Sequence, residues 1–86
     1  MKKLVEVGEE LGLESLLGEK VLLMCANYFY AGKLAVVNDT FVLLEEPSIV
    51  YETGAFTDSV YKDAQRLPSD EWFVLTSAIE SYGKGK

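Results

Sequence analysis

The side chains that could perform chemistry in this 86-residue sequence are mainly carboxylates, because the chain has no histidine and only one cysteine, Cys25. Histidine is the commonest catalytic base and a frequent zinc ligand, and a nucleophilic serine or cysteine usually needs a base beside it. Cys25 lies in an apolar run from Val21 to Ala26, which predicts a buried thiol. We therefore expect no catalytic residue, no cofactor and no enzymatic activity.

Carboxylates gather in and around a polar segment between residues 52 and 71: Glu52, Asp58, Asp63, Asp70 and Glu71. Their spacing matches no calcium-binding loop, and ordinary charge patterning favours a solvated acidic loop. The stretches Gly12–Lys20 and Gly83–Lys86 combine glycine and lysine, but without the spacing of a phosphate-binding loop. The sequence therefore predicts neither a metal site nor a phosphate loop.

Length and charge limit the classes of function. Eighty-six residues make one domain, which we place over residues 1–82 with a disordered tail over residues 83–86. A net charge of −6 is a poor background for attracting polyphosphate, so any contact with nucleic acid must be local. No apolar stretch reaches membrane-spanning length, and a single cysteine fits a reducing compartment. We expect a cytoplasmic protein that contacts no membrane.

The first predicted element is a short amphipathic helix. Leu4, Val7 and Leu11 recur at helical spacing, and glutamates occupy the other side. Gly12 suits the residue that follows a helix, and the leucines from Leu13 to Leu17 predict one further turn.

Three strands are predicted next, over residues 21–26, 30–37 and 41–46. Asn38 and Asp39 form a turn signal between the second and the third. Pro47 is expected to break or bend the third strand before it resumes at Ile49. The interior glycine of the second strand, Gly32, predicts a sharp bend.

Two short strands are predicted near the end of the chain, over residues 72–75 and 78–82. The polar segment before them is too long for a structureless loop in a compact domain, so residues 59–67 are expected to form an irregular strand or a helical turn. The fold class is therefore all-β.

The order and spacing of several short motifs are similar to the Sm-like family. They are Leu17-Gly18-Glu19-Lys20-Val21 followed by Leu23 and Cys25, Tyr30-x-Gly32-x-Leu34, Asn38 with Asp39, and Phe41-Val42-Leu43. The resemblance covers Leu13 to Glu46 and is only positional over Trp72 to Tyr82. It implies a short N-terminal helix followed by a strongly bent five-stranded Sm-like (SH3-like) barrel. A different small barrel is the alternative, and the divergence also looks similar to Sm-like proteins of bacteriophages.

Sm-like proteins form closed homo-oligomeric rings, in which the fourth strand of one protomer pairs with the fifth strand of the next. The resemblance thus implies that the chain's main partner is itself, in a ring of about five to seven protomers with cyclic symmetry. Trp72, Val74 and Ile79 lie where that junction would be, although they could equally fill the chain's own core.

The resemblance also implies a pore-side site for single-stranded RNA. Carried over by position, Asn38 or Asp39 would hydrogen-bond a base edge and Phe41 would stack on it. Thr76 and Ser77 stand where the family has a basic pair, and Val42 stands where it has an asparagine, so the cationic half of the pocket is missing. The alternative for these residues is that Asn38 and Asp39 merely form a turn and Phe41 fills the core. The alternative function is then a structural or protein-interaction ring that binds no nucleic acid.

Overall fold

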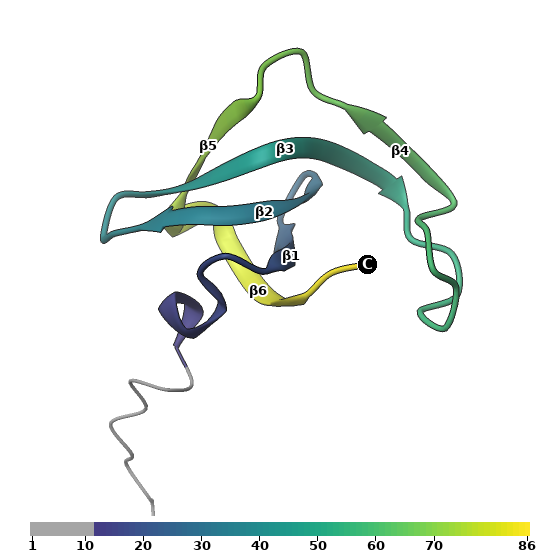
Figure 1. Ribbon diagram of the computed structural model, residues 1–86, viewed down its shortest axis with the longest axis horizontal. Coiled ribbons are helices and arrows are strands. Elements are labelled where there is room, and N and C mark those ends of the chain that lie inside the picture. Colours follow the sequence, from purple (N-terminus) through teal and green to yellow (C-terminus); the bar gives the residue numbers. More distant parts are fainter. Residues whose placement is uncertain (1–11) are drawn as a thin grey trace, which may run out of the picture.

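A computed structural model describes residues 12–86, so the helix predicted over Leu4 to Leu11 lies outside the described residues. A 3₁₀ helix occupies the further turn predicted after it. The elements in chain order are η1 (Leu13–Leu16), β1 (Lys20–Cys25), β2 (Phe29–Val37), β3 (Phe41–Glu52), β4 (Asp63–Arg66), β5 (Glu71–Leu75), η2 (Thr76–Ala78) and β6 (Ile79–Lys84) (Figure 1).

All six strands belong to one antiparallel sheet, which confirms the all-β prediction. The order is β4-β3-β2-β1-β6, and β5 also pairs with β3. Strand β5 lies along the first half of β3 and strand β4 along its second half, so β3 arches between them in Figure 1. Six strands replace the expected five because part of the polar segment forms β4. Within residues 12–86, β5 and β6 do not pair, so the sheet does not close.

Pro47 bends strand β3 without breaking it, which is one of the two outcomes that the sequence predicted. Ala31 pairs with Ser48 and Lys33 pairs with Glu45, so Gly32 alone faces two residues of β3, Glu46 and Pro47. This extra residue is a β-bulge, a place where a strand tolerates proline. Glu46 adopts a left-handed φ of 50° there. The chain therefore bends at this point and continues as one strand.

The main core lies on one face of the sheet. Val21, Leu23, Leu34, Val42 and Leu44 are completely buried in it. A smaller apolar cluster of Leu22, Ala31 and Val50 lies on the other face of β1, β2 and β3. Because successive side chains of a strand point to opposite faces, β1 contributes to both clusters.

Three residues of uncertain role, Trp72, Val74 and Ile79, belong to the chain's own packing. Val74 is 5% exposed within the main core, and Trp72 and Ile79 pack against that core while half-buried. Their packing agrees with the interpretation that they fill the chain's own core.

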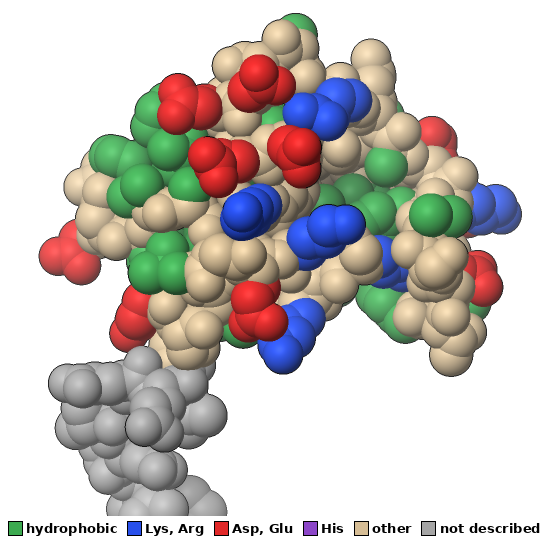
Figure 2. All heavy atoms as spheres, viewed as in Figure 1, with side chains coloured by type: hydrophobic (Ala, Val, Ile, Leu, Met, Phe, Trp, Pro, Cys, Tyr) green, Lys and Arg blue, Asp and Glu red, His purple; other side chains and the backbone are tan. Residues whose placement is uncertain are grey.

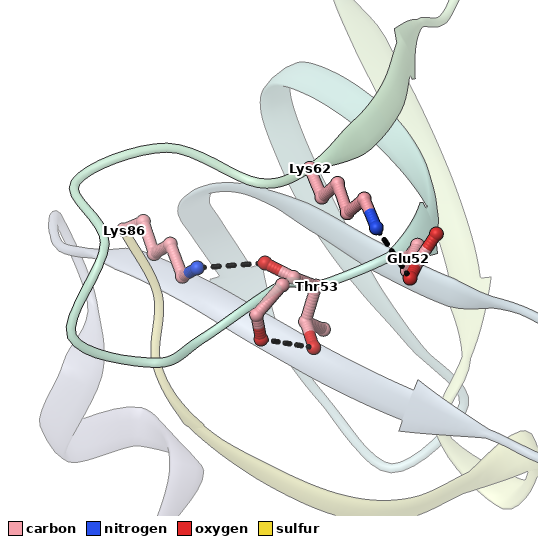
Figure 3. A network of polar contacts seen from close by, with 5 residues as sticks. Glu52, Thr53, Lys62 and Lys86 are labelled. Carbon is pink, nitrogen blue, oxygen red and sulfur yellow. Dashed lines mark hydrogen bonds and ion pairs between the residues drawn. The ribbon is translucent and has the colours of Figure 1, made fainter.

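The last residues differ from the disordered tail that the sequence predicted. Gly83 and Lys84 extend β6, and the Lys86 ammonium donates to the carbonyl oxygens of Thr53 (2.7 Å), Ala55 (2.8 Å) and Val60 (3.1 Å). Figure 3 shows Lys86 reaching into the loop that Thr53 begins. A buried or half-buried ammonium needs such acceptors, and one loop supplies all three. Lys86 thereby ties the chain's end to residues 53–60.

The close approach of β2 and β3 at Gly32 gives a testable prediction. A Cβ atom added there would lie 2.9 Å from the Glu45 carbonyl oxygen and 3.3 Å from the Cα of Pro47, both of them backbone atoms that cannot rotate away. We expect Gly32→Ala to lower the free energy of unfolding by about 1–3 kcal/mol, the usual cost of overpacking. Urea denaturation measures it. Gly83→Ala is the matched control, since its Cβ would meet nothing within 4 Å; equal effects would contradict the account.

Candidate functional site

The residues predicted for RNA binding begin at the turn between β2 and β3. The Asn38 side-chain oxygen accepts hydrogen bonds from the amides of Thr40 (2.9 Å) and Phe41 (2.8 Å). The Asn38 amide in turn donates to the Phe41 carbonyl at 3.1 Å. An asparagine that bonds its own backbone two or three residues on fixes a tight turn. The acceptor of Asn38 is therefore already occupied by the chain itself.

Thr76 lies beside this turn although it is 38 residues away from Asn38 in the sequence. Its hydroxyl donates to the Asn38 carbonyl at 3.0 Å, and its amide donates to the Thr40 carbonyl at 2.9 Å. Asn38, Asp39 and Thr76 line one open pocket of about 680 Å³. The structure thus brings three of the five predicted site residues together.

Phe41 and Ser77 lie apart from that pocket. The half-buried Phe41 ring packs edge to face on Phe73 of β5, with the ring centroids 5.2 Å apart and the planes at 77°. Its neighbour Val42 points the other way, into the core. Ser77 lines a different pocket, together with Cys25 and Trp72.

The electrostatics of the Asn38 pocket disfavour a phosphate. Asp39, Glu14 and Glu80 contribute carboxylates to its lining, and no lysine or arginine of the described residues lines it. Carboxylates repel a phosphodiester, and hydroxyl or amide groups cannot neutralise one. The pocket can donate and accept hydrogen bonds but supplies no positive charge.

The surroundings of the single cysteine make its thiol unreactive. Cys25 is buried, and burial raises its pKa, with a further increase from the Glu80 carboxylate. Since the thiolate is the nucleophile, a raised pKa keeps the reactive form scarce. In the part of the chain that the structure describes, no group of three or more histidine, cysteine, aspartate or glutamate side chains is arranged to hold a metal ion.

The sequence interpretation missed an apolar patch on the outer face of the sheet. Phe73 and Leu75 of β5 are 58% and 60% exposed. The neighbouring strands add Val36, Phe41 and Leu43, which pair with them or with each other across β2, β3 and β5. We call these five residues the outer apolar patch. The alternation in Trp72-Phe73-Val74-Leu75 was the available signal, because burying Trp72 and Val74 turns the other two outward.

Comparison with known proteins finds no relative of this chain. Neither protein-family models nor curated proteins nor solved structures give a match to this chain. None of the helices within residues 12–86 has the length and apolar character needed to cross a membrane.

Proposed function

We propose that this chain assembles head to tail into a closed homo-oligomeric ring of the Sm-like type, with β5 of one copy pairing with β6 of the next. The observation that carries the proposal is that the sheet ends in a free edge on each side. Among the described strands, β4 and β5 each pair only with β3, and β6 pairs only with β1. Each free edge leaves backbone donors and acceptors without strand partners, and a second copy can satisfy both.

The chain order supports an Sm-like barrel as the fold of each copy. A short 3₁₀ helix precedes three consecutive antiparallel strands bent at Gly32, and β6 returns to β1 after the short η2 turn. This is the order that the motifs around Gly18, Gly32 and Asn38 imply. A bent sheet whose two ends stop short of each other is suited to closure through neighbours.

Exposed apolar side chains along β5 favour a second copy as the partner. Large apolar residues on a free strand edge promote uncontrolled association unless something covers them. Phe73 and Leu75 are exposed on β5, and Tyr82 is 43% exposed on β6. Pairing of these two edges would bury apolar surface from both sides at the same junction.

Charge at the strand ends favours an antiparallel pairing. Strand β5 begins at Glu71 and strand β6 ends at Lys84. In an antiparallel pair the start of one strand lies near the end of the other, so the carboxylate of one copy would approach the ammonium of the next. A parallel arrangement is disfavoured, because Glu71 would then approach Glu80 near the start of β6 and the two carboxylates would repel each other.

The ring predicts a defined mass in solution. Light scattering at micromolar concentration should give about five to seven protomers, the size that the Sm-like resemblance implies for a closed cyclic ring. A strictly monomeric species would contradict the ring.

A substitution at the exposed edge tests the junction itself. We expect Leu75→Asp to convert the ring to smaller species, because assembly would bury an unpaired carboxylate between strands. The isolated fold should tolerate it, since Leu75 is 60% exposed. Val60→Asp is the matched control, as Val60 is 70% exposed in the loop that Lys86 holds. Equal masses for wild type and Leu75→Asp would argue against this junction.

Single-stranded RNA at the ring's pore is the second candidate function. It is favoured by the meeting of Asn38, Asp39 and Thr76 in one pocket. It is opposed by the carboxylates of that pocket and by the hydrogen bonds that already occupy the Asn38 oxygen. We therefore favour a structural ring that does not use this pocket for nucleic acid.

Phe41 separates these two candidates. If it stacks on a base, Phe41→Ala should weaken binding of labelled oligouridine at low salt by tenfold or more, since stacking contributes about 1–3 kcal/mol. If the Phe41 ring instead serves only to pack on Phe73, we expect no measurable affinity of the protein for oligouridine. A double-mutant cycle of Phe41→Ala and Phe73→Ala should then give a stability coupling of about 0.5–1.5 kcal/mol. Oligouridine binding that Phe41→Ala or Asn38→Ala weakens would establish the RNA function.

A further inference from the structure

Positive charge is concentrated at one place in this acidic chain. Residues 12–86 contain six lysine and arginine side chains, and four of them line a single pocket of about 480 Å³: Lys20, Lys33, Arg66 and Lys86. Among the described residues, Glu46 contributes the one carboxylate side chain of the lining. Figure 2 shows several blue side chains across the middle of the face drawn, with red carboxylates beside them. The pocket is therefore locally cationic, although the whole chain carries a net charge of −6.

Two of these lysines are neighbours across the sheet. Lys20 of β1 and Lys33 of β2 stand directly opposite each other, and like charges in such cross-strand pairs repel. Lys33 also stands opposite Glu45 of β3 on its other side. Neither lysine forms an ion pair within 4 Å with a carboxylate of residues 12–86. An anion bound between them would remove the repulsion.

The floor of the pocket is open because small residues form it. Gly18, Ala31, Gly32 and Ser48 line it, and the tight crossing at Gly32 leaves the sheet without bulky side chains at that point. A volume of about 480 Å³ falls within the usual range for small-molecule pockets. A ligand of nucleotide size can therefore reach the lysines from solvent.

The remaining two cations play different parts. The Arg66 guanidinium contacts Asp70 at 3.3 Å, but the Asp70 side chain is 97% exposed, so a stronger anion can replace it. Lys86 already donates three hydrogen bonds to the loop carbonyls. Its ammonium also lies 5.1 Å from the centre of the Tyr61 ring, and Tyr61 is part of the pocket wall. Arg66 can thus bind a ligand directly, whereas Lys86 positions the wall.

We propose that this pocket binds a ligand with two or more linked phosphate groups, held by Lys20, Lys33 and Arg66. Lysines act as point charges for phosphate oxygens, and the planar arginine fork can bind two oxygens at once. Three cations around one small pocket suit an extended phosphate chain better than a single carboxylate. The site uses β1, β2 and β4 and leaves the free edges of β5 and β6 untouched, so it does not depend on ring formation.

Calorimetric titration at low salt with tripolyphosphate, and separately with ATP, tests the site. We expect wild type to bind, and Lys20→Gln/Lys33→Gln to lose at least tenfold in affinity for both ligands. The matched control is Lys62→Gln/Lys84→Gln, which removes the same charge outside the pocket and should change affinity by less than about threefold, because only diffuse attraction is lost. Tighter binding of ATP would assign a nucleotide as the ligand, and equal affinities would assign the phosphate chain alone.

Two further variants keep the test independent of folding. Lys33→Gln removes both the repulsion from Lys20 and the attraction to Glu45, so the urea midpoint should stay close to that of wild type. A loss of binding at an unchanged midpoint cannot be attributed to unfolding. Glu46→Asn removes the one carboxylate of the lining and suits the left-handed φ, so it should strengthen binding several-fold. No binding by wild type at millimolar tripolyphosphate, or an equal loss in the control pair, would overturn the site. The ring's mass is measured separately and can fail without affecting this result.

Discussion

The crossing of Gly32 by the bulge at Glu46 and Pro47 is the constraint on which the rest of the structure depends. A side chain at Gly32 would collide with the backbone of β3, so β2 and β3 approach there as they could with no other residue. The bulge lets β3 bend and offer its two halves to β5 and β4. The core is enclosed on one face, while the sheet ends at two separate free edges.

The bend also separates surfaces of different chemistry. An apolar patch lies outside β5, an acidic pocket lies beside Asn38, and a cationic pocket lies over the floor formed at Gly32. We propose that phosphate binds at the third of these and not at the pocket that the family resemblance indicated. We also propose that copies of the chain meet at the apolar patch and the free edges.

Much of the fold could be predicted because short apolar segments bounded by turn residues are typical of strands. From Val21 onward β1 is a continuous apolar run with both faces covered, Asn38 and Asp39 separate β2 from β3, and Gly32 marks the bend. Pro47 was expected to break or bend the third strand, and it bends it, because a proline at a bulge does not end a strand. The sequence predicted an irregular strand or a helical turn over residues 59–67, and β4 is a strand within that range. The pairing of β4 with β3 and the role of Lys86 could not be predicted, since an exposed strand lacks an apolar pattern and the loop carbonyls that hold Lys86 depend on backbone geometry.

The candidate sites were less predictable than the fold. Asn38 and Thr76 were selected correctly as neighbours, but residue type did not reveal that the Asn38 oxygen serves the turn. Lys20 and Lys33 are far apart in the sequence, and only the strand register makes them opposite. The Sm-like ring stays a prediction, which depends on whether the free edges of β5 and β6 pair between copies.

Amide hydrogen exchange resolved along β5 and β6 tests that pairing most directly. Some amides of residues 71–75 and 79–84 have no hydrogen-bond partner within the chain. They should be protected from exchange at high protein concentration, and they should exchange faster after dilution to a concentration at which the ring dissociates. Amides at the β1–β2 pairing should keep their protection in both conditions. Rapid exchange of the β5 and β6 amides at every concentration would contradict pairing between copies.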